Sequence, residues 1–305
     1  MSQSSSIIAR PGEQVYRPPL IRPKAVKRAV KIALLLVLMF LYFLPIWWLI
    51  KSSFQPESEI KTTEFSLITL SPTLENFAKA LSDPNFLLWF RNSIILAVAT
   101  AVIAICTASL AAYSLARVPV RFTRLGARFY FLAYIAPGVM VVIPLYVVLS
   151  AFKLTDTYLG LIITYTSFAI PFSTWLLRAY FASLPADLED AALVDGCTRL
   201  GALWRVVLPI SAPGLATVAL FSFILAWNDV LFAVIFTNST EMRTLSIGLR
   251  FYARDAMGIG ASSATSHGIG SVYAMSLLVV APAFLIFVLL QQYLVRGLAA
   301  GAVKG

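Results

Sequence analysis

Charged residues are scarce in this chain of 305 residues, at 12% of the total. A soluble protein has about 25%, so the shortage argues against a soluble globular protein, and the 59% share of hydrophobic residues excludes a disordered chain. Two cysteines exclude a secreted disulfide scaffold. A single histidine, His267, leaves little room for imidazole chemistry or a metal site. The composition therefore predicts a membrane protein.

Long hydrophobic runs are abundant. A helix needs about 20 mostly apolar residues to cross a bilayer core of about 30 Å. A transmembrane β-barrel would instead show alternating segments of about ten residues, a pattern that the sequence does not display. The sequence predicts an all-α membrane protein with six transmembrane helices. These expected spans are 32–50, 92–116, 129–152, 157–177, 211–238 and 268–295.

The distribution of basic residues predicts the orientation. Seven of them precede the first span, in residues 1–31, and four arginines without an acid follow the second span, in residues 117–128. Because Lys and Arg favour the cytoplasmic side, both segments and both termini are expected in the cytoplasm. The first span lacks a small-x-small cleavage site and is interpreted as an uncleaved anchor. Since membrane topology accounts for the basic excess, a nucleic-acid surface is the weaker interpretation.

The segment 178–208, between the fourth and fifth spans, is too long and too patterned for a simple connector. Pro185 and the following acids are typical of a helix N-terminus. Asp195-Gly196 then predicts a break, because glycine accepts a left-handed turn. We expect a helix–turn–helix at the cytoplasmic membrane surface.

The second helix of this segment is expected to begin at a Thr198 cap. Its apolar residues follow helical spacing and are expected on one face: Leu200, Leu203, Trp204 and Val207. Pro209 is expected to end the helix, and Pro213 to open the fifth span. The apolar face could dock on another protein or lie on the bilayer. The acids favour docking, since the inner leaflet is negatively charged.

Three motifs make a family resemblance visible. The run Glu189-Asp190-Ala191-Ala192-Leu193-Val194-Asp195-Gly196, continuing to Pro209, resembles the EAA loop of ABC importer permeases. Trp227-Asn228-Asp229 is similar to the W-N-D of many sugar permeases, and the tail 291–305 is similar to the terminal signature of the maltose-permease G type. Asn92-Ser93, which opens the second span, fits the same family. Two small departures are Asp190 in place of glutamate and Cys197 in place of a small alanine.

The resemblance implies the type I ABC importer permease fold and transport of a sugar by alternating access across a prokaryotic cell membrane. The implied partners are a second homologous permease or a second copy of this chain, two ATPase subunits, an extracytoplasmic solute-binding protein and membrane lipid, without nucleic acid. The chain contains no G-x-x-x-x-G-K-[ST] phosphate loop. It is therefore expected to be a transporter subunit rather than an enzyme, to bind no cofactor, and to leave ATP and Mg²⁺ to the ATPases. The expected domains are a basic leader 1–31, a permease domain 32–296 with a coupling loop 183–208, and a tail 297–305.

The resemblance also implies residue roles in coupling to the ATPase. The motif residues and the apolar face would contact or transmit motion from an ATPase subunit. These coupling candidates are Glu189, Asp190, Ala191, Ala192, Asp195, Gly196, Leu200, Leu203, Trp204 and Pro209.

Polar and aromatic residues within the spans are candidates for the translocation pathway. An ionisable group in a span is a candidate because exposing it to lipid costs about 3 kcal/mol. Asp229 could line the pathway or pair with Arg91 or Arg243. Trp227 could stack on a sugar or sit at the membrane interface. The pathway candidates are Trp227, Asn228, Asp229, Tyr134 and Tyr165. Whether the loop 239–267 enters the binding protein stays open.

Other classes fit less well. An ion-coupled secondary transporter is expected to have inverted repeats and several buried ionisable groups, whereas one acid, Asp229, interrupts the spans. An intramembrane serine protease would need a histidine within the membrane, but His267 lies outside the spans proper. Permeases for glycerol phosphate or polyols share the motifs and remain open as alternatives.

Overall fold

The computed structural model describes residues 23–61, 66–69, 71–117, 138–259 and 268–302. Contacts divide the chain into two units, 1–48 and 49–305, which are described separately. The division falls inside the first predicted span, near the end of helix α1 (Pro23–Ser53).

The described part of the first unit is the greater part of α1, which is 31 residues long and contains Pro45. Its apolar side chains are exposed along the helix, with Tyr42 at 75%. A helix that is apolar all round needs a lipid or protein environment. Residues 27–53 are long and apolar enough to cross a membrane.

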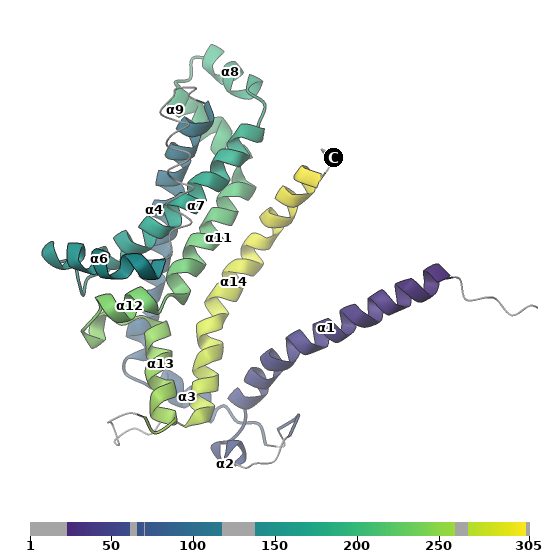
Figure 1. The fold of residues 1–305 in the computed structure, drawn as a ribbon, viewed down its shortest axis with the longest axis vertical. Coiled ribbons are helices and arrows are strands. Elements are labelled where there is room, and N and C mark those ends of the chain that lie inside the picture. The colour runs from purple at the N-terminus through teal and green to yellow at the C-terminus, as the bar shows by residue number, and fades with distance from the viewer. Residues whose placement is uncertain (1–22, 62–65, 70, 118–137, 260–267, 303–305) are drawn as a thin grey trace, which may run out of the picture. The chain divides into compact units, whose positions relative to one another are not determined.

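The second unit is built around three long helices, α4 (Phe86–Arg117), α7 (Tyr158–Ser183) and α11 (Ala212–Asn228). Helix α4 packs along α7 and α11, and α14 (Ile269–Ala302) packs against α11 (Figure 1). Alanines recur every three or four residues on the buried face of α4, which allows close approach of helix backbones. These alanines are Ala97, Ala101, Ala104, Ala108 and Ala112.

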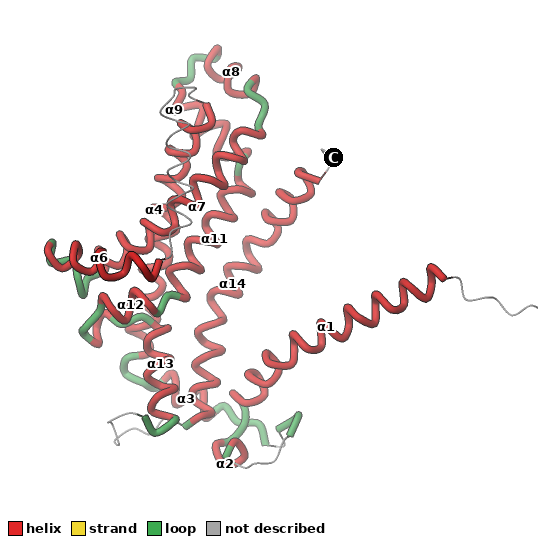
Figure 2. The backbone as a smooth tube through the Cα atoms, in the orientation of Figure 1, coloured by secondary structure: helices red, strands yellow, loops and turns green. Residues whose placement is uncertain are grey.

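Shorter helices lie at the two ends of this bundle (Figure 1). One end holds α8 (Asp187–Val194) and α9 (Arg199–Ala202), and the opposite end holds α3 (Glu75–Leu81) and α13 (Leu245–Ala256). The described residues contain helices, turns and loops, without a strand, as the tube in Figure 2 shows. The remaining elements are α2 (Glu57–Ile60), α6 (Gly138–Ala151), π-helical η1 (Leu203–Val207), α10 (Leu208–Ile210), α12 (Leu231–Phe236) and 3₁₀-helical η2 (Thr240–Met242).

The membrane spans are confirmed in part. Within the described residues, four helices are long and apolar enough to cross a membrane, or up to five if a bent helix pair counts as one span. The predicted third span is represented by α6, of 14 residues, and its earlier residues 129–137 lie outside the described part. The predicted fifth span 211–238 is not one helix, because α11 ends at Asn228 and α12 follows after a break.

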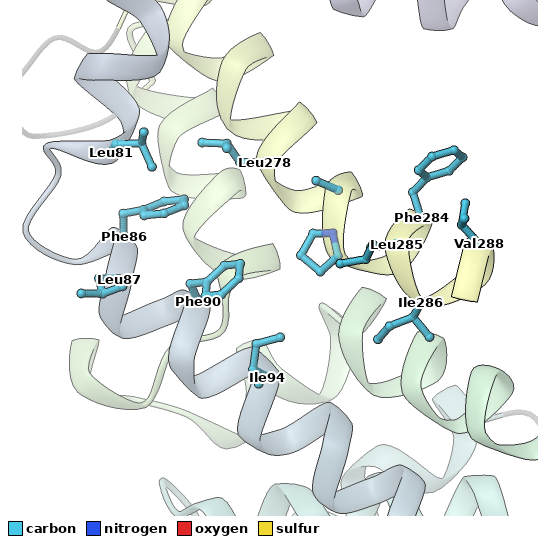
Figure 3. Close-up of a pocket in the computed structure, with 12 residues that line it drawn as sticks. Leu81, Phe86, Leu87, Phe90, Ile94, Leu278, Phe284, Leu285, Ile286 and Val288 are labelled. Atoms are coloured by element: carbon cyan, nitrogen blue, oxygen red, sulfur yellow. The ribbon is translucent and has the colours of Figure 1, made fainter. Parts of the chain in front are cut away.

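An apolar groove of about 820 Å³ separates the start of α4 from the middle of α14 (Figure 3). Phe86 and Phe90 project from α4 toward it, and Leu278 and Ile286 line it from α14. An apolar surface of this kind is expected where a protein contacts lipid or another helix. The groove therefore fits the membrane assignment.

Candidate functional site

The segment between α7 and α11 forms the predicted helix–turn–helix. Helix α8 begins at Asp187 with three acids in its first turn, where the helix dipole favours negative charge. Gly196 has φ +85°, the left-handed conformation that glycine adopts most readily. Thr198 caps α9 by accepting a 3.1 Å hydrogen bond from the Gly201 N–H. The break at Gly196 and the Thr198 cap are both confirmed.

The second half of this segment differs from the prediction. After α9 the chain continues as the π turn η1, in which the Leu208 N–H bonds the Leu203 carbonyl, five residues earlier. Pro209 has no N–H to donate to the carbonyl of Arg205, so a regular α-helical bond is missing there. Pro209 lies within α10 and does not end the preceding helix. The chain then bends by 82° into α11, which Pro213 opens as predicted.

The expectation of one apolar face on the second helix is wrong. Leu203 and Val207 are buried, at 0% and 1% exposure, in a cluster with Tyr113 of α4 and Phe181 of α7. Leu200 and Trp204 are exposed, at 58% and 56%. A π turn holds more residues than an α turn, so residues three apart within η1, such as Trp204 and Val207, no longer share a face.

Exposed apolar residues instead come from both helices of the segment. We name Leu188, Val194, Leu200 and Trp204 the outward apolar set; each is at least 44% exposed. Asp190, Ala191, Asp195 and Gly196 are also exposed. Most of the coupling candidates therefore face outward, whereas Glu189, Ala192, Leu203 and the neighbouring Ala202 are buried.

Glu189 is the buried acid of the segment. Its Oε1 accepts a 2.6 Å bond from Arg117 Nε, at the end of α4, in a salt bridge. Its Oε2 accepts a 3.0 Å bond from the Tyr113 hydroxyl. Arg117 Nη2 also donates to the carbonyl of Leu184, which follows α7, at 3.2 Å. Sequence reasoning placed Glu189 in the motif without finding these partners, which lie more than 70 residues earlier.

The acid of the W-N-D motif joins α7 to α12. Asp229 Oδ2 accepts 2.9 Å hydrogen bonds from the Tyr165 hydroxyl and the Ala233 N–H. Within the described residues, no salt bridge joins Asp229 to Arg91 or Arg243, the two alternatives considered from sequence. The carboxylate instead satisfies the free N–H groups at the start of α12.

The other pathway candidates divide by exposure. Trp227 is 1% exposed, and its Nε1 donates 2.9 Å to the Val279 carbonyl on α14, which places the ring in the core. Tyr165 is fully buried, and Asn228 is exposed. Tyr134 lies outside the described residues, as does His267.

At the opposite end of the bundle, Asn92 forms a hub that sequence analysis noted only as a motif. Its amide donates 2.7 Å and 2.9 Å to the carbonyls of Glu241 and Arg243. Its Oδ1 accepts from the Tyr158 hydroxyl at 2.5 Å. The Leu245 N–H bonds the neighbouring Ser93 hydroxyl at 2.8 Å. An Asn-Ser pair at the start of an apolar span is the signal that could have predicted this role.

A second acid at this end organises the connection before α7. Asp156, at φ +58°, accepts hydrogen bonds from the N–H groups of Asn238 and Ser239, at 2.9 Å and 3.2 Å, and from the Ser239 hydroxyl. Burial opposes ionisation, but these hydrogen bonds outweigh it and lower the pKa of the Asp156 carboxyl below its ordinary value. The described residues contain no cluster of acids, cysteines or histidines that could hold a metal ion.

This arrangement, helical spans with a helix–turn–helix at one end, agrees with three comparisons. Residues 104–300 match the family described as binding-protein-dependent transport system inner membrane component. The sulfoquinovosyl glycerol permease SmoH of Agrobacterium fabrum is 32% identical over 86% of this chain and 88% of its own length. The trehalose/maltose permease MalG of Thermococcus litoralis is 32% identical over 93% of this chain and its full length.

A solved structure of a bacterial ABC transporter involved in import of the polysaccharide alginate contains a chain with the same fold. It superposes with a TM-score of 0.78 over 91% of this chain and 99% of that one, at 22% identity. The chain belongs to the binding-protein-dependent transport inner membrane components, the permease subunits of ABC importers. The family resemblance read from the motifs is therefore confirmed, and the protein is a transporter subunit, not an enzyme.

Proposed function

We propose that this chain forms half of the translocation pathway of a sugar importer. In this proposal six helices cross the membrane, both termini are cytoplasmic, and the segment 183–208 is the EAA coupling loop. A second homologous permease or a second copy completes the pathway. Two ATPase subunits bind ATP and Mg²⁺, and an extracytoplasmic binding protein delivers the solute.

The observation that best supports the coupling role is the outward apolar set. Four large apolar side chains and several acids are exposed on a short segment at the end of the bundle, as is typical of a segment that docks in a protein groove. The segment continues into α11 through an 82° bend. Movement of the docked segment would be transmitted through this connection to the membrane helices. The transporter would then switch between its inward-open and outward-open states.

The proposed cargo is a sugar or glycoside. The support is the similarity to permeases named for trehalose, maltose and sulfoquinovosyl glycerol. Among the pathway candidates that the structure describes, Asn228 and Asp229 have exposed surface. An amide can donate and accept hydrogen bonds, and a carboxylate can accept several, so both groups can bind a solute with many hydroxyl groups.

The test is reconstitution of the chain with an ATPase, a second permease and a binding protein from its own organism. Proteoliposomes would be supplied with labelled maltose, trehalose, glycerol phosphate or a polyol. We expect sugar uptake that requires ATP and the binding protein, and that stops when the ATPase carries an inactive phosphate loop. Uptake by the chain alone under an ion gradient would establish a secondary transporter instead. Uptake of glycerol phosphate or a polyol but no sugar would overturn the cargo assignment.

Cys197 provides a test of the orientation and of the docking. Cys197 is partly exposed in the turn between α8 and α9. The other cysteine, Cys106 on α4, is removed by Cys106→Ser. A thiol reagent that cannot cross the membrane should label Cys197 from the cytoplasmic side only. A bound ATPase should protect it from labelling. Labelling from the outside would contradict the topology.

A further inference from the structure

Glu189 lies in the proposed coupling loop but points away from the surface on which an ATPase would dock. It is 6% exposed, whereas its neighbours Leu188 and Asp190 are exposed. Both of its carboxylate oxygens are bonded to α4, one to Arg117 and one to Tyr113. Its described polar contacts therefore run into the bundle.

Arg117 holds three elements together. It is the last described residue of α4, its Nε pairs with Glu189 of α8, and its Nη2 donates to the Leu184 carbonyl that follows α7. The planar guanidinium presents its N–H donors in fixed directions, so one side chain can serve both acceptors. A lysine ammonium is a point charge without this fork.

The covalent route from the coupling loop into the membrane is bent. Between η1 and α11 the chain passes through α10 and turns by 82° at Ser211. A break of this kind can act as a hinge that absorbs part of an imposed movement. The Arg117–Glu189 pair bypasses it, because it joins α8 directly to α4, which packs along both α7 and α11.

We propose that Arg117 is a positioning residue that makes α8 and α4 move as one body, so that the coupling loop drives the bundle through α4 as well as through α11. This inference rests on the proposed function, since it assumes that the loop receives movement from an ATPase. Tyr113 fixes the second carboxylate oxygen and thereby the orientation of the Glu189 side chain. Glu189 then transmits movement inward and leaves docking to the outward apolar set.

Single substitutions and a paired substitution separate coupling from stability. Arg117→Met or Glu189→Met alone leaves one buried charge without its partner, and is expected to reduce the amount of assembled complex. The double variant R117M/E189M removes both charges and keeps apolar bulk, so assembly should recover. We expect the recovered complex to hydrolyse ATP but to move about tenfold less solute per ATP, within the range of measured coupling between sites.

Three outcomes would overturn the inference. Wild-type transport per ATP in the double variant would make the pair a structural contact only. Loss of the ATPase from an otherwise folded Glu189→Gln complex would show that Glu189 contacts the ATPase itself. The control Asp187→Asn removes an exposed acid from the same helix. An equal loss of coupling in this control would point to the net charge of α8 as the cause.

A distance measurement keeps the inference testable if the substitutions prevent folding. Spin labels at Ser114→Cys on α4 and Asp187→Cys on α8 occupy exposed positions, after both native cysteines are replaced by serine. We expect the label distance to be the same in nucleotide-free and vanadate-trapped complexes. A change between the two states would overturn the inference. Failure of the wild-type chain to bind any ATPase would instead overturn the proposed function.

Discussion

The Tyr165 hydroxyl on α7 donates a 2.9 Å hydrogen bond to the carboxylate of Asp229, at the break between α11 and α12. The same carboxylate accepts from two N–H groups of α12. The acid that interrupts the predicted fifth span is therefore the joint at which three helices meet. This position gives it a structural role in addition to its proposed place in the pathway.

Tyr165→Phe tests the structural role. The substitution removes one hydrogen bond to the Asp229 carboxylate and is expected to cost about 1–3 kcal/mol of stability, measured as a lower unfolding temperature of the purified complex. Tyr180→Phe is the matched control on α7, because its hydroxyl makes no hydrogen bond to the described residues. An equal effect of both substitutions would contradict the assignment.

Asp229→Asn tests the pathway role. The amide keeps an oxygen that can accept from the N–H groups of α12 but loses the charge. If Asp229 lines the pathway, solute uptake falls while the amount of assembled complex is maintained. Uptake at the wild-type rate for every sugar tried would remove Asp229 from the pathway.

Gly196→Val tests the turn between α8 and α9. The left-handed backbone at φ +85° costs a residue with a side chain roughly 1–2 kcal/mol, and a β-branched residue suffers most. A Cβ would meet no atom within 4 Å, so the effect is backbone strain rather than a clash. We expect loss of transport with normal membrane insertion. Gly196→Asn, which tolerates this conformation, should retain most transport; equal loss in both variants would contradict the explanation.

Gly248→Ala tests the packing of α13 on α4. A Cβ at this position would overlap the Trp89 indole, and such overpacking typically costs about 1–3 kcal/mol. We expect a lower unfolding temperature and faster proteolysis around α13. Gly138→Ala is the control, because its Cβ would make ordinary contacts at 3.6 Å. Unchanged stability in Gly248→Ala would show that α13 can shift at little cost.

Asp156 predicts a pH dependence. Its pKa is lower in the folded chain than the value of about 3.9 expected when unfolded. Ionised Asp156 therefore contributes stability above the unfolded pKa, and the contribution is lost as the pH falls through the folded pKa. Asparagine at this position tolerates the same φ but lacks the charge, so Asp156→Asn isolates the effect of the charge. The wild-type advantage in unfolding temperature should be present at pH 7 and shrink below about pH 4; a constant difference would exclude the charge as its cause.

Local signals predicted local structure well. Thr198, Gly196 and Pro213 were identified from sequence as a cap, a turn and a helix start, because each acts on backbone groups within a few residues. The structure does not have the single apolar face that the sequence predicts for the helix after Thr198, because the π turn before Pro209 changes which residues align. Hydrophobic periodicity assumes a regular helix, and that assumption fails where a proline removes a hydrogen bond.

The amino-acid sequence by itself determined that the chain is a helical membrane protein, since hydrophobic length and charge reflect a physical requirement of the bilayer at each span. Its motifs indicated the family by resemblance. Only the tertiary structure decided that Glu189 faces Arg117, that Asn92 holds the carbonyls of Glu241 and Arg243, and that Asp229 bonds Tyr165. These partners lie 64 to 151 residues apart. A buried polar group must find a partner, but which partner it finds depends on how the helices pack.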